Sequence, residues 1–135
     1  MHPLRKLRES GKPSAAQVRA LLADNVVFNS PILARSIEGA DAIAAIFAQS
    51  SETRGSGAYV SEEKVDARTT FLRWVGTMDG RKIESFEVIV DNEDGLIVER
   101  TIALRPFPAV KLFRDAMHAA LKDKLPPDVW DYPED

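Results

Sequence analysis

The sequence contains no cysteine and only two histidines, His2 and His118. The absence of thiols excludes disulfide bonds, thiolate metal sites and cysteine nucleophiles. Two histidines are too few for a histidine-rich metal site, and no motif indicates a cofactor. We therefore expect neither a metal centre nor a cofactor.

Long apolar runs and an excess of one charge are also missing. No stretch approaches the roughly 20 apolar residues that a membrane-spanning helix needs. Residues 1–10 are basic but lack the apolar block of a secretory signal. The 18 basic and 21 acidic residues give a net charge of −3, which favours neither nucleic acid nor a membrane surface as a partner. We expect a cytoplasmic protein that binds neither.

What is present is the composition of an ordinary globular protein. Of the 135 residues, 44% are hydrophobic and 29% are charged, which suits one domain with a substantial core. We expect a single domain over residues 1–135, with residues 123–135 as an acidic, proline-rich C-terminal tail. Trp130 and Tyr132 are the side chains expected to hold this tail.

Helical patterns occupy the first and last parts of the chain. Ser14 precedes Gln17 by three residues, a capping-box pattern that predicts a helix in residues 14–24. Apolar residues at helical spacing predict a second helix in residues 40–49 and a closing one in residues 110–121. The first two helices are expected to enclose a short strand.

Strand patterns dominate residues 58–106, after a connection in residues 50–57 that we expect to be flexible. Asp79-Gly80 stands between two strand-like runs and is the strongest hairpin signal in the sequence. Residues 92–95 form a second, looser turn. The order of helix, strand, helix, antiparallel meander and helix predicts an α+β fold.

The two turns set the strand register and therefore the faces of the sheet. A two-residue turn at 79–80 places Leu72 opposite Glu87, and a four-residue loop at 92–95 places Glu87 opposite Arg100. One face then carries a mostly apolar set with one acid–base pair: Leu72, Trp74, Gly76, Ile83, Ser85, Glu87, Ile89, Val98, Arg100, Ile102 and Leu104. A three-residue loop would instead separate Glu87 from Arg100.

The opposite face of this sheet is also apolar enough to need cover. It carries Arg73, Val75, Phe86, Val88, Val90, Ile97, Glu99, Thr101 and Ala103. Such a face is covered by a helix or by another subunit. This pattern favours a homodimer formed through the outer sheet face, although pattern alone does not decide which face is the interior.

Two segments resemble the nuclear transport factor 2-like superfamily, in particular SnoaL-like polyketide cyclases and ketosteroid isomerases. They are ALLADNVVFNSPILARSIEGADAIAAIF at residues 20–47 and DNEDGLIVERTIALRP at residues 91–106, and the resemblance covers residues 4–122. It implies a cone-shaped, strongly curved antiparallel sheet wrapped around N-terminal helices, usually as a dimer, with a pocket for a lipophilic small molecule.

The sequence departs from the ketosteroid isomerases at the positions that carry their chemistry. Those members have a catalytic aspartate before the proline of the first strand, where this chain has Ser30 before Pro31. The tyrosine of their first helix has no counterpart, since Tyr59 and Tyr132 lie elsewhere. Their second acid matches Glu87, so the resemblance places Glu87 on the pocket side.

Glu87 and Arg100 are therefore the candidate catalytic residues, and three interpretations of them stay open. They form a structural ion pair, or they anchor a carbonyl or hydroxyl of a ligand, or Glu87 transfers a proton while Arg100 tunes its acidity. The candidate ligand-binding residues are Trp74, Ser30, Asn29, Leu72 and Ile102. Trp74 is alternatively a core residue, and Asn29 and Ser30 are alternatively turn caps.

Two classes of function remain. The first is a small-molecule enzyme of the isomerase, cyclase or hydratase type that acts on a lipophilic compound bearing a carbonyl or hydroxyl. The second is a non-catalytic ligand-binding or dimerisation module of the same fold. The missing aspartate and tyrosine argue against the ketosteroid isomerase reaction itself.

Overall fold

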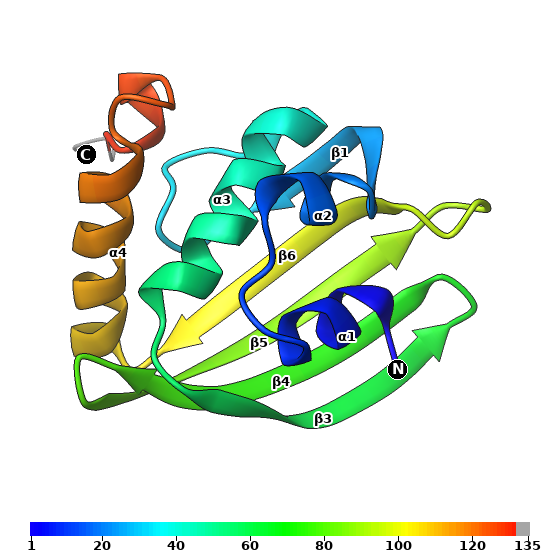
Figure 1. Ribbon diagram of the computed structural model, residues 1–135, viewed down its shortest axis with the longest axis horizontal. Coiled ribbons are helices and arrows are strands. Elements are labelled where there is room, and N and C mark those ends of the chain that lie inside the picture. The colour runs from blue at the N-terminus through cyan, green and yellow to red at the C-terminus, as the bar shows by residue number, and fades with distance from the viewer. Residues whose placement is uncertain (132–135) are drawn as a thin grey trace.

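The computed structural model describes residues 1–131 as a strongly curved sheet with helices on one face (Figure 1). The elements in chain order are α1 (Pro3–Glu9), α2 (Ala15–Arg19), β1 (Leu22–Asn29), β2 (Ile37–Glu38), α3 (Ala40–Thr53), β3 (Gly57–Asp66), β4 (Thr69–Met78), β5 (Arg81–Asp91), β6 (Ile97–Arg105), α4 (Phe107–Leu121) and a 3-10 turn (Pro127–Val129). Helices segregated to one side of the sheet confirm the predicted α+β class.

The strands form one six-stranded sheet in the order β2-β1-β6-β5-β4-β3. β1 runs parallel to β6, and every other neighbouring pair is antiparallel. The long strands β3 to β6 curl around the helices, which gives the predicted cone shape (Figure 1).

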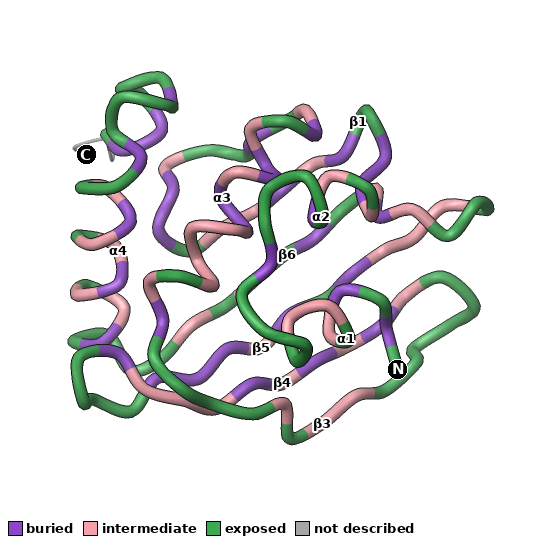
Figure 2. Tube along the Cα trace, viewed as in Figure 1, coloured by how far each residue is buried: buried purple, intermediate pink, exposed green. Residues whose placement is uncertain are grey.

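The core lies between the inner sheet face and the apolar stripes of α3 and α4 (Figure 2). α3 buries Ile43, Ile46 and Phe47, which recur at the three- and four-residue spacing of one helical face. α4 buries Phe113 and Met117 on successive turns. These stripes were visible in the sequence because the helical period alone produces them.

The predicted Asp79-Gly80 hairpin is confirmed. Asp79 has φ 48° and Gly80 has φ 76°, and positive values at both positions are those of a type I′ turn. Leu72 lies opposite Glu87, as the two-residue turn requires.

The predicted register between β5 and β6 is wrong by two residues. Glu87 lies opposite Ile102, and Arg100 lies opposite Ile89. Because side chains alternate between faces with a period of two, this shift leaves Glu87 and Arg100 on the same face as diagonal neighbours.

The register error has two parts of one residue each. Asp91 lies opposite Ile97 instead of Leu96, so the predicted four-residue loop at 92–95 is wrong. A bulge at the start of β6 adds the second residue. The pairing shifts between Val90, which lies opposite Glu99, and Asp91, which lies opposite Ile97. Val98 is therefore the extra residue of a β-bulge. The bulge turns Ile97 into the core and leaves Val98 half-buried, the reverse of the predicted faces.

Helix α1 was not predicted, because it is short, basic and buries a single residue, Leu4. Its N-cap is His2, whose Nδ1 accepts a hydrogen bond from the Leu4 backbone N–H at 3.1 Å. The other ring nitrogen of His2 lies 3.0 Å from an Asp91 carboxylate oxygen. This contact fastens α1 to the far end of β5.

The other helices differ from prediction in length. The capping box of Ser14 and Gln17 is confirmed, but α2 ends at Arg19 because the chain from Leu22 pairs with β6. α3 continues to Thr53, four residues beyond its predicted end at residue 49. Residues 50–53 are therefore helical rather than part of a flexible connection.

The C-terminal tail packs on the body of the protein as far as it is described. Trp130 is buried, with its ring edge-on to His118 at 5.1 Å. Val129 is also buried, and its carbonyl accepts from the Ala34 N–H at 2.7 Å. The expectation for Tyr132 falls outside the described residues.

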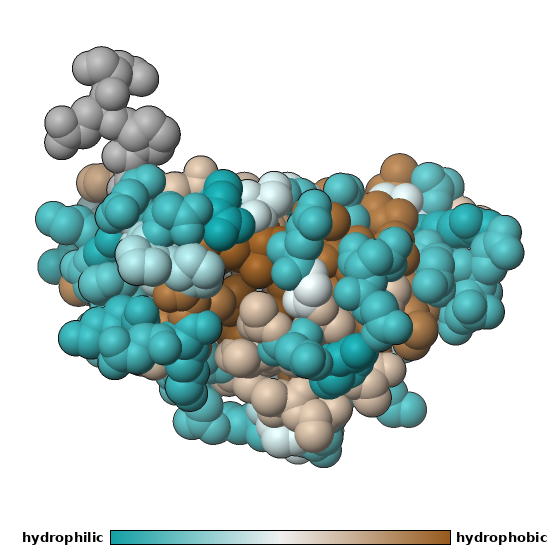
Figure 3. Space-filling model, turned by 90° about the horizontal axis from the view of Figure 1, so that it is seen from above, coloured by the Kyte–Doolittle hydropathy of each residue, from teal (hydrophilic) through white to brown (hydrophobic). Residues whose placement is uncertain are grey.

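The outer sheet face is uncovered in the single chain. Val60 and Val88 are exposed there, and Phe86 lies half-buried beneath Arg73, whose guanidinium carbon is 5.4 Å from the ring centroid. Apolar side chains also reach the surface between polar ones on the face seen in Figure 3. Exposed apolar area alone therefore does not locate an interface, and the homodimer stays a prediction.

None of the helices in residues 1–131 combines the length and the apolar character needed to cross a bilayer.

Candidate functional site

Two cavities of very different size meet at one arginine, Arg54. The inner cavity lies inside the cone, has a volume of about 30 Å³, and is lined by residues that include Ser30, Phe47, Arg54, Arg100, Ile102 and Phe113. The outer pocket lies between α1, the end of α3 and the strands β3 and β4, and has a volume of about 560 Å³. Its lining includes Arg8, Glu9, Lys12, Arg54, Tyr59 and Trp74.

The inner cavity occupies the place where the resemblance implied a ligand pocket. Its lining includes Phe28, Phe47 and Phe113, and Phe28 and Phe47 are in edge-to-face contact at 4.8 Å. A volume of about 30 Å³ matches roughly one water molecule, whereas small-molecule sites measure about 300–1,000 Å³. The cone interior is therefore packed rather than open.

Glu87 and Arg100 form an ion pair inside the cone. Arg100 donates from Nη2 to Oε2 of Glu87, and the two residues are 2% and 1% exposed. The guanidinium carbon of Arg100 also lies 4.4 Å from the ring centroid of Phe47. Oε1 of Glu87 and Nε of Arg100 have no hydrogen-bond partner within residues 1–131.

Only one member of this pair reaches a cavity. Arg100 lines the inner cavity, and Glu87 lines neither the inner cavity nor the outer pocket. A general acid or base has to come within hydrogen-bond reach of the proton that it transfers. In this conformation, Glu87 cannot do so for a molecule in the outer pocket.

The remaining sequence candidates separate into three groups. Ser30 and Ile102 line the inner cavity, and Trp74 lines the outer pocket. Leu72 is fully buried and lines neither, and the same is true of the half-buried Asn29. The structure thus does not bring these five residues together.

Ser30 and Asn29 have local structural partners. The Ser30 hydroxyl accepts from the Ile32 backbone N–H at 3.3 Å, which caps the turn after β1. Asn29 donates from Nδ2 to Thr101 at 2.9 Å and accepts from the Ser36 hydroxyl. Its amide therefore joins β1, β6 and the following loop.

Trp74 has its position in the outer pocket because two glycines leave room for it. Gly57 of β3 lies directly opposite Gly76 of β4, next to the opposed pair Tyr59 and Trp74. A Cβ at Gly57 would lie 2.2 Å from Cζ2 of Trp74, and a Cβ at Gly76 would lie 2.1 Å from Cη2. The indole therefore lies close against the backbone of both strands.

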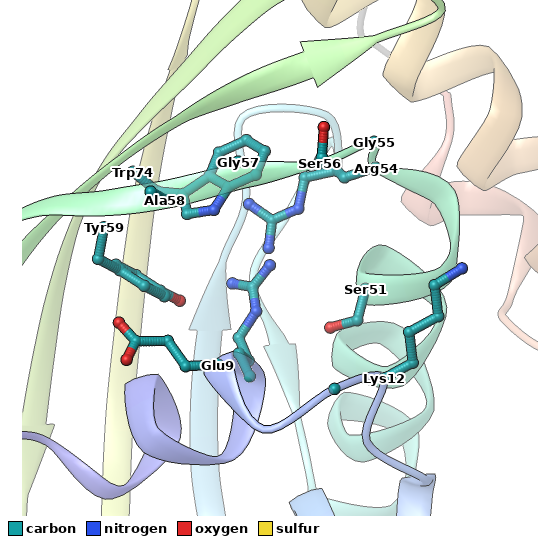
Figure 4. A pocket seen from close by; sticks show the side chains of 12 residues that line it. Glu9, Lys12, Ser51, Arg54, Gly55, Ser56, Gly57, Ala58, Tyr59 and Trp74 are labelled. Carbon is teal, nitrogen blue, oxygen red and sulfur yellow. The ribbon is translucent and has the colours of Figure 1, made fainter.

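Arg54 follows the last residue of α3 and is held in place by its neighbours. Gly55 donates its backbone N–H to the Thr77 carbonyl at 2.9 Å, and Thr77 donates to the Ser56 carbonyl at 3.1 Å. These bonds attach the segment to the end of β4. The guanidinium carbon of Arg54 lies 4.4 Å from the Trp74 ring centroid, and Figure 4 shows the Arg54 side chain reaching from the end of α3 toward the indole.

Arg54 is buried without an acid. The residue is 8% exposed, and its Nε and Nη2 atoms are covered and lack a hydrogen-bond partner in the described part of the chain. It forms no ion pair there, although the negative end of the α3 dipole is close by. A buried charge is ordinarily paired, so this residue is an exception.

The second arginine of the outer pocket comes from α1. The guanidinium carbon of Arg8 lies 5.9 Å from the Tyr59 ring centroid. Burial lowers the pKa of Arg8 from its usual range, and the nearby charge of Arg100 lowers it further. Burial also raises the pKa of the Tyr59 hydroxyl, against the effect of the Arg8 charge. Tyr59 is therefore neutral over the physiological range.

The other charged groups at the outer pocket already have partners. Glu9 accepts from Nε of Arg5 at 2.7 Å, and Lys12 lies 3.5 Å from Glu52. Arg8, like Arg54, forms no ion pair with an acid of residues 1–131. The pocket therefore carries a local positive charge on a chain whose net charge is −3.

No cluster of three or more histidine, aspartate or glutamate side chains that could hold a metal ion occurs within the described residues.

Comparison with known proteins identifies the fold. No protein-family model matches the sequence, and no curated protein is significantly similar to it. An uncharacterized bacterial protein with a cystatin-like fold from Silicibacter pomeroyi superposes with a TM-score of 0.82, at 25% identity over 92% of this chain and 89% of that chain. A steroid delta-isomerase from Pseudomonas aeruginosa gives 0.75, at 22% identity over 81% and 80%.

A third solved structure carries the name of the fold. It is an NTF2-like protein of unknown function from Cytophaga hutchinsonii, with a TM-score of 0.56 at 17% identity over 81% of this chain and 86% of that chain. The chain has the nuclear transport factor 2-like fold. Identities of this size establish the fold and leave the function to the site itself.

Three residues of the outer pocket were missed by reasoning from the sequence: Arg8, Arg54 and Tyr59. The nuclear transport factor 2-like resemblance directed attention to the cone interior, and residues 50–57 were expected to be flexible. The one available signal was Gly57 and Gly76 beside Trp74, because glycine in a strand often marks close approach of another group.

Proposed function

We propose that this protein binds a small organic molecule in the outer pocket. The observation that carries the proposal is the contrast between the two cavities. The outer pocket has the volume of a small-molecule site, about 560 Å³, and combines Trp74 and Tyr59 with charged groups. The inner cavity has room for roughly one water molecule.

In this proposal, Glu87 and Arg100 are a structural ion pair beneath the site. Their burial and the position of Glu87 outside both cavities support that interpretation over proton transfer. Removing either partner would leave the other charge buried and unpaired. We further propose a cytoplasmic homodimer that pairs through the outer sheet face, where Val60 and Val88 are exposed.

A second candidate is an acid–base enzyme of the isomerase, cyclase or hydratase type. Two observations favour it: Oε1 of Glu87 has no partner among residues 1–131, and Ser30 and Arg100 line the same inner cavity. This activity on a lipophilic carbonyl- or hydroxyl-bearing compound requires the inner cavity to open. Turnover of such a compound that is lost in Glu87→Gln would establish the enzyme.

The binding proposal is tested through the fluorescence of Trp74. The chain has two tryptophans, so the variant Trp130→Phe reports on Trp74 alone. Compounds bearing carbonyl, hydroxyl or carboxyl groups are screened at millimolar concentration, and binders are expected to change the Trp74 emission. Trp74→Phe, which keeps Trp130, is the control and should show no change. No response to any compound would refute binding in the outer pocket.

A further inference from the structure

The unpaired Arg54 specifies the chemistry of the ligand. We propose that the outer pocket binds a small organic anion, a carboxylate, whose acidic group pairs with the guanidinium of Arg54 beside Trp74. This inference rests on the proposed function, because it names the class of molecule that the same pocket takes.

The first argument is the missing acceptor. Arg54 is 8% exposed, and two of its covered nitrogens have no hydrogen-bond partner in residues 1–131. Arg100 shows how the same chain treats a buried guanidinium that serves structure, because there Glu87 supplies the acceptor. Burying a charge without an acceptor opposes folding, so retaining one at a pocket wall indicates a partner that comes from outside.

The second argument is geometry. The Trp74 indole is seated against Gly57 and Gly76, and Arg54 stacks on it at 4.4 Å. The backbone hydrogen bonds of Gly55 and Ser56 with Thr77 fix the residues that follow Arg54 to the end of β4. Because Nε and Nη2 are covered, the guanidinium meets the pocket through Nη1, and the fixed group offers a carboxylate a preorganised, charged donor there.

The third argument is the local charge. Glu9 pairs with Arg5 at 2.7 Å and Lys12 lies 3.5 Å from Glu52. Arg8 and Arg54 line the same pocket and add two positive charges without an acidic partner among residues 1–131. A cleft lined by one sign of charge concentrates ligands of the opposite sign.

A neutral ligand does not satisfy these groups. An amide offers one carbonyl oxygen and no charge, so the Arg54 guanidinium would stay largely unpaired. Tyr59 and Trp74 add aromatic surface to the lining, which favours an apolar, ring-bearing body on the acid. The expected class is therefore an aromatic or similarly apolar carboxylic acid in its ionised form.

The test compares acids with their uncharged amides by isothermal titration calorimetry. The probes are benzoate and 2-naphthoate against benzamide and 2-naphthamide, at pH 7 and low salt. At least one acid is expected to bind about tenfold or more tightly than its amide, as a charge-assisted hydrogen bond predicts. The affinity of the acid should fall as salt rises.

Three variants assign the effect to Arg54. Arg54→Met should abolish the preference for acid over amide, and Arg54→Lys should keep part of it because the charge remains without the fixed, planar donor group. Lys122→Met is the control for the loss of one positive charge, since the exposed Lys122 follows α4 and lines neither the inner cavity nor the outer pocket. It should change the affinity by less than about twofold.

The outcomes separate this inference from the proposed function. Amides that bind as tightly as the acids, or a preference for acids that survives in Arg54→Met, would overturn the inference that the ligand is an anion. The proposal that the outer pocket binds a small molecule would still stand. Failure of both acids to bind also overturns the anion, and the neutral compounds of the Trp74 screen then decide whether any binding exists. If Arg54→Met does not fold, the wild-type comparison of acid with amide still decides.

Discussion

Two buried arginines line the inner cavity, and they differ in whether an acid pairs with them. Arg100 on β6 and Arg54 after α3 each lie 4.4 Å from the centroid of an aromatic ring, Phe47 and Trp74 respectively. Arg100 has the carboxylate of Glu87, whereas Arg54 has no acid within residues 1–131. The difference teaches that burial alone does not show whether a charge is satisfied inside the protein. The acidic partner decides that, and its absence at Arg54 is the observation behind the proposed ligand.

Arg100→Met is expected to have the largest effect on stability. The substitution keeps an apolar chain of similar length but leaves the Glu87 carboxylate buried without a cation. We expect the free energy of unfolding to fall by about 3–5 kcal/mol, the usual result of breaking a buried pair. Urea denaturation monitored by circular dichroism measures it.

The double variant Glu87→Gln with Arg100→Met is the control, since it removes both charges. It should recover much of the lost stability, because neither residue then leaves a buried charge without a partner. The two substitutions are therefore expected to be non-additive. An Arg100→Met protein as stable as the wild type would show that the pair is not structural.

Gly57→Ala should have an intermediate effect on the free energy of unfolding, because it displaces the Trp74 ring on which Arg54 stacks. The new Cβ would lie 2.2 Å from the Trp74 ring, so the indole has to move. We expect a loss of about 1–3 kcal/mol, as for other overpacked sites, measured by urea denaturation. The Cβ would also lie 2.6 Å from the Val75 carbonyl oxygen, so part of the loss should remain in a Trp74→Phe background, where the smaller ring relieves the rest. Equal losses in both backgrounds would contradict the seating of Trp74 on the glycines.

Arg54→Met should change the stability of the ligand-free protein by less than about 1 kcal/mol. The lost stacking on Trp74, about 0.5–2 kcal/mol, is offset by removal of an unpaired buried charge. Thermal and urea denaturation of this variant beside Arg100→Met gives the direct comparison. A loss as large as that of Arg100→Met would mean that Arg54 has a structural partner after all.

The smallest effect on stability is expected at Glu84, which pairs with two arginines on the outer sheet face. Arg73 and Arg105 hydrogen-bond to Glu84 and lower the pKa of its carboxyl, but both arginines are largely exposed, at 40% and 59%. The folded pKa lies below the unfolded value of about 4.3. The Glu84 contribution is therefore present above that value and is lost as the pH falls through the folded pKa.

Glu84→Gln should accordingly lower the stability at pH 7 by a small amount and flatten the dependence of stability on pH below about 4.3, because the contribution that acid removes from the wild type is already absent from the variant. Urea midpoints measured between pH 3 and pH 7 test this expectation. An unchanged acid dependence in the variant would show that Glu84 has the same pKa in the folded and unfolded states.

Much of the fold was predictable because it depends on neighbouring residues. The Asp79-Gly80 turn, the Ser14 capping box and the apolar stripes of α3 and α4 are encoded by local chemistry and period. The inward direction of Glu87 came from the family resemblance together with the first hairpin. The period of two kept Arg100 beside it even though the predicted register was wrong.

The failures share a non-local cause. The bulge at Val98 depends on how β6 pairs with β5, and α1 is too short to be stable without its contacts at Leu4 and His2. Residues 50–57 read as flexible because their small and polar residues are those of a loop. Their order comes from Thr77 and Trp74, which are distant in the chain.

The sequence by itself determined the α+β class and the Asp79-Gly80 hairpin, because turn chemistry and side-chain periodicity act over a few residues. Only the tertiary structure decided that the cone interior is filled, that Arg8 and Arg54 share one pocket, and that Arg54 is buried without an acid. Each of these depends on which distant side chains meet, and a missing partner for a charge has no signature in the order of the residues.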